Sequence, residues 1–380
     1  MKGLKFRIYP SEAQIEQIQV NCNCSRFVYN RMLDLYEQVY KKEKKSLSYT
    51  KMANLLPALK NDEASSFLKD ADSMCLQEAV RDLDRAFQNF FKHRAKYPKF
   101  KKRKNLYGKT YRTRNQSDGI RIIDKDHIRL PILGSVKIKL SRPIEGKINN
   151  ATISVTPTGK YFVSLCVEEW RPYKKEAPHT EIGIDVGLAE FYTDSKGREV
   201  FAPRAYTKYQ RRLAKEQRSL SRMHERAKKA HVPLWQCKNY QKQKLVVARV
   251  HEKIANVRKD FLQKTSTRLC DENQIICVEH LNIKGMKKNH HLARAISDVA
   301  WSKFFTMLEY KQKERHGYLV KVDTFFPSSQ TCHCCGSINP KIKDLRIREW
   351  DCPVCGTHNG RDHNAAINIL NEGIRQFASA

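Results

Sequence analysis

The sequence lacks any long apolar run and is poor in acidic residues and in cysteine. No apolar stretch approaches the ~18 residues that a membrane-spanning helix requires, so a membrane span is excluded. The N-terminus, from Met1 to Phe6, has neither the apolar core nor the small-residue cleavage site of a secretion signal, so we expect a cytoplasmic protein. The 12 cysteines in 380 residues are too few for a disulfide-stabilised scaffold.

The shortage of acidic residues gives the chain a large positive charge. It has 72 Lys and Arg against 40 Asp and Glu, a net charge of +32 with His neutral. Because 40% of the residues are apolar, a disordered polycation is excluded, and the 16 Tyr and 16 Phe argue against a histone-like tail. The length suggests roughly two to three domains. We therefore expect a soluble globular protein that binds a polyanion, with nucleic acid as the first candidate.

Five of the 12 cysteines crowd into residues 332–355 in a metal-binding pattern. Two Cys-x-x-Cys pairs, each followed by a glycine (Gly336 and Gly356), have the spacing of ligands for one tetrahedral Zn²⁺. A closed four-cysteine site leaves no position for water, which predicts a structural role. His333 or Cys334 as a substitute ligand stays open. The four predicted ligands are Cys332, Cys335, Cys352 and Cys355. The other seven, which we expect to pack in the core, are Cys22, Cys24, Cys75, Cys166, Cys237, Cys270 and Cys277.

The first part of the chain has mostly helical patterns. A short strand from Lys5 to Tyr9 precedes a helix whose start, Ser11 with Gln14, has the spacing of a capping box. We expect this strand to pair with strands later in the chain, because it would otherwise have no partner. Helical patterns continue to about residue 96. One segment repeats apolar residues at steps of three and four, which predicts the seam of a helix bundle: Leu76, Val80, Leu83, Phe87 and Phe90.

The pattern changes twice after the helical part. Residues 91–104 hold eight basic residues in fourteen with aromatics between them, typical of a loop that contacts phosphates. From about 108 to 170 apolar residues alternate, which predicts the short strands of a small β-barrel-like unit. A charged boundary with two prolines follows at 171–179. Beyond it, strands and long helices succeed one another in an order that predicts α/β structure with a mixed sheet. The predicted fold class is multidomain, α+β and α/β.

Three acidic residues stand within or beside apolar segments. Asp185 lies in an apolar strand, Glu279 ends a second one, and Asp362 opens the final helix. Each has an ordinary explanation by itself, as a turn, a strand end or a helix N-cap. Two acids on neighbouring strands and one on an adjacent helix would together supply the hard oxygen ligands of two Mg²⁺ ions for phosphodiester hydrolysis. We expect these three residues to be catalytic and to bind the Mg²⁺.

A basic face runs along a predicted helix over 204–229, where ten basic residues meet only two acids, Glu216 and Glu225. Salt bridges cannot account for this excess, whereas a nucleic-acid backbone can. A solvated face is the alternative. Apolar residues from Val247 to Phe261 at helical spacing predict the partner helix. The face, called the basic stripe below, comprises Lys208, Arg211, Arg212, Lys215, Arg218, Arg222, Arg226 and Lys229.

Several motifs together resemble TnpB, the family of RNA-guided nucleases of bacterial insertion sequences that is related to type V CRISPR effectors. The resemblance covers nearly the whole chain. It rests on the strands with Asp185 and Glu279, on the zinc-ribbon pattern and on five further segments: Arg361-Asp362-His363-Asn364-Ala365-Ala366, Leu281-Asn282-Ile283-Lys284-Gly285-Met286, Ser328-Ser329-Gln330-Thr331-Cys332, Tyr97-Pro98-Lys99-Phe100-Lys101 and Phe6-Arg7-Ile8-Tyr9-Pro10.

The resemblance implies an RNase H-like RuvC nuclease domain interrupted by the zinc ribbon, with a helical recognition domain and a β-barrel wedge domain. It implies Asp185, Glu279 and Asp362 as the catalytic triad. Where the family often reads His-Asp-Arg-Asp, this chain has Asn359-Gly360-Arg361-Asp362, which leaves the rate and the metal preference at this loop open. The implied bounds are 1–10 and 106–178 for the wedge, 11–105 for recognition, 179–326 and 359–380 for the nuclease, and 327–358 for the ribbon.

The resemblance also implies partners: a guide RNA derived from the transposon end and double-stranded DNA with a short adjacent motif, without a required protein partner, in a bacterial, nucleoid-associated setting. Base reading would fall to the recognition and wedge domains, where amides such as Gln77 and Asn115 suit an A/T-rich motif. Ordinary surface polarity is the alternative. The predicted base-reading residues are Tyr49, Ser73, Gln77, Thr113 and Asn115.

The function that the sequence predicts is an RNA-guided DNA endonuclease with two Mg²⁺ and a structural Zn²⁺. A nuclease-inactive RNA-guided repressor or transposition regulator is the alternative, although such proteins typically lose triad carboxylates that this chain retains. A guide-independent resolvase or transposase is disfavoured, because the positive surface exceeds what one DNA contact needs.

Overall fold

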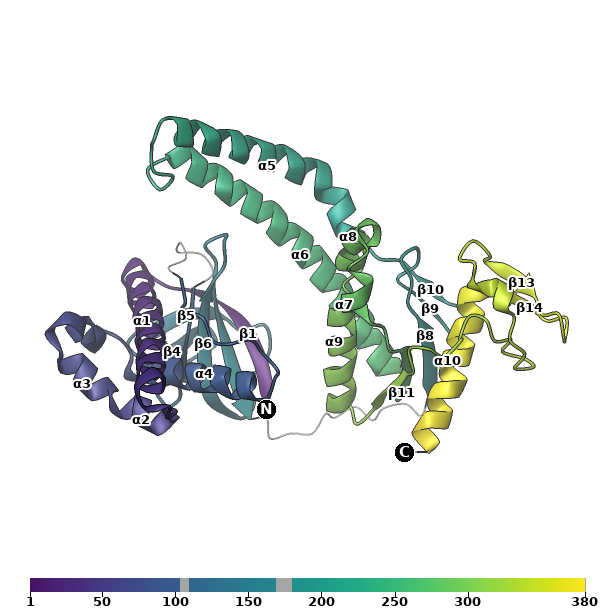
Figure 1. The fold of residues 1–380 in the computed structure, drawn as a ribbon, viewed down its shortest axis with the longest axis horizontal. Helices are drawn as coiled ribbons and strands as arrows, with labels where there is room; N and C mark the ends of the chain where they lie inside the picture. The colour runs from purple at the N-terminus through teal and green to yellow at the C-terminus, as the bar shows by residue number, and fades with distance from the viewer. Residues whose placement is uncertain (103–108, 169–179, 380) are drawn as a thin grey trace. The chain divides into compact units, whose positions relative to one another are not determined.

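The computed structural model describes residues 1–102, 109–168 and 180–379, which divide into two compact units, Met1–Arg171 and Pro172–Ala380 (Figure 1). The predicted boundary at 171–179 and the last two residues of the basic loop at 91–104 lie outside the described residues. Within the described ranges, no helix combines the length and the apolar character that crossing a membrane requires.

The sheet of the first unit has seven antiparallel strands in the order β2-β6-β7-β1-β5-β4-β3. The N-terminal strand β1 pairs with both β7 and β5, which confirms the prediction that it joins the later strands. Leu4, Phe6 and Ile8 point alternately into the core along β1. The strands are β1 (Lys2–Tyr9), β2 (Thr110–Arg114), β3 (Arg121–Ile122), β4 (His127–Leu130), β5 (Gly134–Lys139), β6 (Lys147–Val155) and β7 (Tyr161–Glu168).

The helices of the first unit lie between β1 and β2 in the sequence. Ser11 caps the first helix as predicted: its hydroxyl accepts from the Gln14 N–H, and the Gln14 side chain accepts from the Ser11 N–H. Four of the five predicted seam residues, Leu76 to Phe87, are buried on the last helix, which ends at Phe91 rather than at about 96 because the chain turns at His93 with a φ of 55°. The helices are α1 (Glu12–Glu43), α2 (Tyr49–Asn54), α3 (Leu56–Asn61), the 3₁₀ helix η1 (Glu63–Asp70) and α4 (Ser73–Phe91).

The sheet of the second unit is mixed, as predicted. Its order is β10-β9-β8-β11-β12, with β8, β11 and β12 parallel and with β9 and β10 added as an antiparallel hairpin. All residues of β11 before its last are buried, which explains its continuous apolar run. The strands are β8 (Glu181–Asp185), β9 (Tyr192–Asp194), β10 (Glu199–Val200), β11 (Ile275–Glu279) and β12 (Tyr318–Val322).

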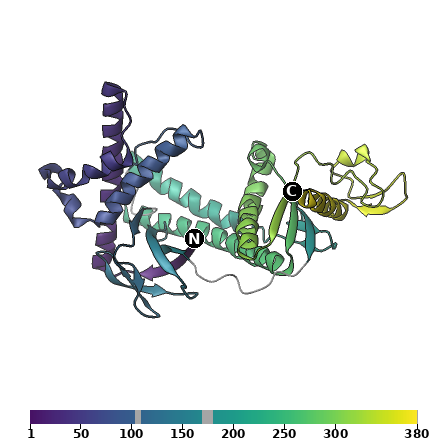
Figure 2. The ribbon, with the colours of Figure 1, turned by 90° about the horizontal axis from the view of Figure 1, so that it is seen from below.

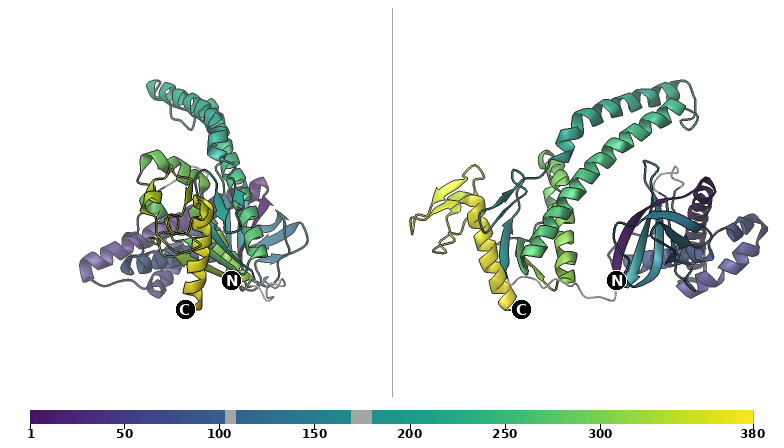
Figure 3. Two further views of the ribbon diagram at one scale, coloured as in Figure 1. Left: turned by 90° about the vertical axis from the view of Figure 1, so that its right-hand side faces the viewer. Right: turned by 180° about the vertical axis from the view of Figure 1, so that it is seen from behind.

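Helices cover both faces of this second sheet (Figure 3). Ile276 and Val278 of β11 pack with residues of α6 and α9, whereas Ile275 and Cys277 pack with α10 on the opposite face. The helices α5 and α6 run side by side as a long hairpin (Figure 2). The elements are α5 (Ala205–Lys229), α6 (Lys238–Glu272), α7 (Ile283–Met286), α8 (His290–Val299), α9 (Trp301–Glu314) and α10 (Arg361–Ala378), with a ribbon of η2 (Pro340–Lys343), β13 (Glu349–Asp351) and β14 (His358–Gly360) before α10.

Candidate active site and metal centre

Two of the three predicted catalytic carboxylates end neighbouring strands of the mixed sheet. Asp185 is the last residue of β8, and Glu279 is the last residue of β11. The two strands are parallel, and Ile184 pairs with Val278. Asp185 and Glu279 are the next residues in their strands, so they lie at the same edge of the sheet. The carboxyl ends of parallel strands are where open α/β sheets bind their ligands.

The third carboxylate comes from the helix that packs most closely on β8. Asp362 lies in the first turn of α10. The close approach of α10 depends on Gly183, because a Cβ at that position would lie 2.1 Å from the carbonyl oxygen of Ala366. Asp362 also accepts a hydrogen bond from Arg348 of the ribbon, with Nη1 and Oδ2 3.1 Å apart. The helix therefore brings Asp362 toward Asp185 while the ribbon supplies a cation.

Electrostatic interactions connect the three carboxylates. Burial, together with the negative charges of Asp362 and Glu279, raises the pKa of Asp185 from an ordinary 3.8 to about 8. The Arg361 guanidinium acts in the opposite direction on this pKa. Burial also raises the pKa of Glu279. The ionised carboxylates are unfavourable in this site without a counter-ion. A divalent cation that binds oxygen ligands would compensate their negative charge.

A cavity of about 330 Å³ opens beside Asp362. Arg348, Arg361 and His363 line it together with acidic residues of the hairpin and the ribbon. The His363 Nε2 lies 3.3 Å from the carbonyl oxygen of Ser195, so the side chain bridges α10 and the β9–β10 turn. The cavity is large enough for a phosphate and part of a sugar, and it presents cations beside the acids.

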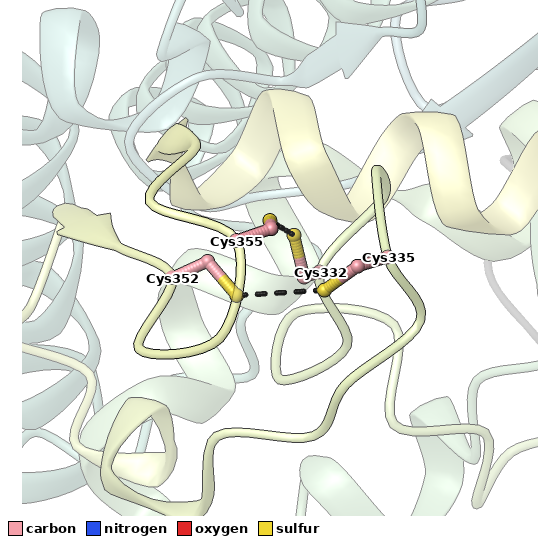
Figure 4. Close-up of side chains that lie close together, drawn as sticks. All are labelled: Cys332, Cys335, Cys352 and Cys355. Carbon is pink, nitrogen blue, oxygen red and sulfur yellow. Dashed lines mark hydrogen bonds between the residues drawn. The ribbon is translucent and has the colours of Figure 1, made fainter.

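The four predicted zinc ligands converge in the ribbon (Figure 4). Their sulfurs all lie within 4.8 Å of one another, with 3.7 Å between Cys332 and Cys355 and 3.6 Å between Cys335 and Cys352. Four thiolates bound at ~2.3 Å around a tetrahedral zinc ion would lie about 3.8 Å apart. In the described part of the chain, this is the ligand cluster that forms; the three carboxylates do not make a comparably compact one.

The surroundings shift the pKa values of two of the four thiols in opposite directions, and burial raises the pKa of Cys332 to about 11. The Ser337 hydroxyl lies 3.2 Å from the Cys352 sulfur and, with a backbone N–H of Cys355, lowers the pKa of Cys352 to about 6. Cys334 is exposed and His333 is bonded to Asn359 and Asn364, so neither alternative ligand joins the cluster. Of the seven other cysteines, five are buried, in accord with the predicted packing role.

Asparagines of α10, which the sequence analysis did not single out, fasten the ribbon to the helix. The side-chain amides of Asn364 and Asn368 donate to the carbonyl oxygen of Thr331 at 2.8 and 2.6 Å. Asn364 also accepts from the His333 N–H at 2.9 Å. Their spacing of four residues on the final helix was the available signal. Arg348 was missed as well, because no pattern in the sequence connects it to Asp362.

The basic stripe lies along α5 with all eight members exposed. No ion pair joins any of them to a carboxylate in the ranges that the structure covers. The opposite side of α5 packs on α6 through Leu213, Val247 and Val250, as the apolar spacing predicted. The stripe is therefore an exposed cationic surface on a hairpin of two packed helices.

The predicted base-reading residues have varied surroundings. The Tyr49 hydroxyl accepts from Arg81 at 3.1 Å, and the Ser73 hydroxyl from Lys60 at 2.7 Å. Thr113 is buried, and Gln77 is half-buried on α4. The Asn115 amide bonds to the backbone of Ile120 and Ile148 and would have to release these bonds to reach a base. Base reading by these five residues stays a prediction.

Three protein families match parts of the chain. Residues 164–290 match a family described as "Probable transposase", residues 301–369 match "Cas12f1-like, TNB domain", and residues 1–45 match "Helix-turn-helix domain". The last description differs from the local structure, which has the strand β1 followed by the single helix α1.

Two relatives match over most of their own length. A protein of Streptomyces pristinaespiralis named "Putative RNA-guided DNA endonuclease" is 37% identical over 99% of this chain and 90% of its own. An Escherichia coli K12 protein named "Putative RNA-guided DNA endonuclease InsQ" is 32% identical over 98% and 92%. In fold, the chain is similar to Cas12f1 as solved in a Cas12f1-sgRNA-target DNA complex, with a TM-score of 0.61, 14% identity and coverage of 94% and 82%.

Proposed function

Because the chain belongs to the family of TnpB-like RNA-guided DNA endonucleases, we propose that it cuts DNA at sites chosen by pairing with a bound guide RNA. The observation that carries the proposal is the group of Asp185, Glu279 and Asp362, whose charges interact at one edge of the mixed sheet. The guide RNA would derive from the transposon end, and the target would be double-stranded DNA with a short adjacent motif.

In this proposal the three carboxylates hold two Mg²⁺ ions. The bound ions would supply a water of lowered pKa and stabilise the charge that develops on the phosphodiester. The ionised carboxylate of Asp185 is unfavourable in the metal-free site, and a bound cation would stabilise it. Arg348 and Arg361 in the cavity beside Asp362 orient and partly neutralise the phosphate.

The remaining parts have supporting roles. Zn²⁺ held by the four cysteines keeps the ribbon folded, and with it Arg348 and the start of α10. The basic stripe binds nucleic-acid backbone, since its exposed cations have no protein partners in the described chain. The wedge would comprise residues 1–10 and 106–178, which extend past the end of the first unit at Arg171. The recognition helices would lie at 11–105, with Tyr49, Ser73, Gln77, Thr113 and Asn115 near the flanking motif.

The test is a cleavage assay with purified ribonucleoprotein. The complex is recovered from its host, its RNA is sequenced, and a plasmid library with randomised flanks is cut in Mg²⁺. Asp185→Ala and Glu279→Ala should abolish cutting, because each removes a metal ligand, while RNA binding survives.

A matched control is Asp351→Ala, which removes an exposed ribbon carboxylate that bonds to His358 at 2.8 Å and should leave cleavage intact. Residual cutting by either active-site variant would refute the triad. An intact complex that binds target yet leaves plasmid uncut in Mg²⁺ would instead favour a guided repressor or transposition regulator.

A further inference from the structure

Another cavity lies within the first unit and has a volume of about 500 Å³. It is lined by α1, by residues 100–102 and by residues 109–110. Among the described residues, its lining includes no acidic residue and four basic ones: Arg26, Lys101, Lys102 and Lys109. The ring of Phe100 also lines it and is 49% exposed. This volume falls in the range of roughly 300–1,000 Å³ typical of ligand pockets.

The cationic walls are fixed to α1 by hydrogen bonds. The Asn30 amide donates to the Lys101 carbonyl at 3.0 Å and accepts from the Lys101 N–H at 2.7 Å. The Lys101 ammonium lies 3.9 Å from the centroid of the Tyr29 ring. The Lys109 ammonium donates to Asn23 at 3.2 Å. The positive charges of Lys101 and Lys109 are therefore held against α1, whereas the Lys102 side chain is exposed.

Among the described residues, no ion pair joins the four basic side chains of this cavity to a carboxylate. The Arg26 Nε is buried without an acceptor among the described residues. Lys101 is close enough to Asp82 to sense its charge, but Asp82 already bonds to Arg112 at 2.6 Å. A buried donor without an acceptor is unfavourable, and an anion in the cavity would supply the acceptor that the Arg26 Nε lacks.

We propose that this cavity binds a backbone phosphate of a nucleic acid, with the sugar or base beside that phosphate against Phe100. The cavity supplies guanidinium and ammonium donors for phosphate oxygens, and its apolar wall suits a nucleoside. The proposal rests on the proposed function, which brings RNA and DNA to the chain, and it names one of their contact sites. Free phosphate is the other source of the same chemistry.

The experiment measures binding of a fluorescein-labelled single-stranded RNA to the full chain at several salt concentrations, with inorganic pyrophosphate as competitor. Arg26→Gln and Lys102→Gln should each weaken RNA binding about tenfold and lower the salt slope by about one. Lys102 is exposed, so its variant keeps the packing around the cavity. Lys69→Gln, an exposed lysine of η1 outside the cavity, is the matched control and should change neither quantity.

Unchanged affinity and slope in both cavity variants, with normal melting temperatures, would overturn the proposal and leave the proposed function intact. Cavity variants that lose pyrophosphate binding but keep full RNA affinity would overturn the assignment to a nucleic-acid backbone in favour of free phosphate. A wild-type chain that binds neither RNA nor DNA would overturn both the site and the proposed function.

Discussion

At the scale of single residues, two properties of Asp185 disfavour its ionised form in the metal-free protein. It ends an apolar strand, and its charge faces Asp362 and Glu279. Both the burial and the neighbouring negative charges favour its protonated form, which is why its pKa rises to about 8. A folded protein that keeps this residue therefore sacrifices stability unless a cation is bound.

The raised pKa of Asp185 predicts an unusual pH dependence of stability. Below pH 4 the carboxyl is protonated in both states; between about 4 and 8 the unfolded chain releases the proton while the folded chain retains it. The free energy of unfolding of the metal-free protein should therefore fall as the pH rises through this window. Asp185→Asn should remove most of that slope and stabilise the metal-free protein by about 2 kcal/mol at pH 7. Urea unfolding at several pH values measures both effects.

The control is the wild-type protein with Mg²⁺, in which the slope should diminish because the cation stabilises the ionised carboxylate. An Asp185→Asn variant with the slope of the wild type would show that Asp185 does not carry the effect.

Single residues also show where the sequence analysis stopped. The strand positions of Asp185 and Glu279 and the clustering of the four cysteines could be predicted, because each follows a local pattern, an apolar strand or a Cys-x-x-Cys spacing. Arg348 could not, because its contact with Asp362 depends on how the ribbon folds back on α10. Asn115 shows the opposite case. The sequence predicted an amide that could bind a base, but in the structure this amide forms hydrogen bonds with the backbone of Ile120 and Ile148.

At the scale of elements, the contact between α10 and β8 determines where Asp362 lies. Gly183 has no side chain to separate them, and an added Cβ would also lie 2.7 Å from the Leu370 backbone nitrogen. Gly183→Ala should therefore displace α10, lower the free energy of unfolding by about 3 kcal/mol and reduce cleavage through misplacement of Asp362. Denaturant unfolding and the plasmid assay measure the two effects.

Gly3→Ala is the matched control, because Gly3 also lies in a strand and an added Cβ there would meet nothing within 4 Å. It should leave cleavage unchanged. If Gly183→Ala were as stable and as active as Gly3→Ala, the close packing of α10 would not be what positions Asp362.

The basic stripe gives a second prediction for an element. Because Arg218 and Arg222 are exposed on α5, each should contact phosphate when RNA or the RNA–DNA duplex is bound. Arg218→Ala and Arg222→Ala should each lower the slope of log affinity against log salt by about one. Filter binding across a salt series measures the slope.

Arg375→Ala is the control for the stripe, since this arginine lies on α10 and is paired with Glu372 at 2.7 Å. Its slope should stay that of the wild type. Equal slopes for all three variants would mean that the stripe is an ordinary solvated face.

Elements were predictable where their signal is local. The capping box at Ser11, the mixed sheet and the apolar spacing behind the stripe all follow from short patterns. The end of α4 was not, because the left-handed turn at His93 has no glycine or proline to mark it. The close approach of α10 to β8 could not be predicted either, because no local sequence pattern indicates which helix packs on Gly183.

At the scale of the whole molecule, the chain divides its apolar residues between separate cores. One cluster, from Leu4 to Val167, belongs to the first unit, and the clusters around β8, β11 and the ribbon belong to the second. Within the second unit, the ribbon's own cluster is small and includes two of the zinc ligands, Cys332 and Cys352. We therefore expect the ribbon to depend on the predicted zinc ion more than any other part of the described chain does.

Removing zinc should consequently unfold a defined part of the molecule. A chelator, or Cys352→Ser, should abolish hydrogen-exchange protection in the ribbon and in the first turns of α10, because Asn364 and Asn368 bond to Thr331 of the ribbon. The seven-stranded sheet of the first unit should keep its protection, since its core contains none of the ligands.

Cys237→Ser, which removes a thiol outside the cluster, should change neither region. Loss of protection that spreads equally to the first unit would show that the two cores fold as one. Loss confined to the ribbon would show that α10 keeps Asp362 in position without it.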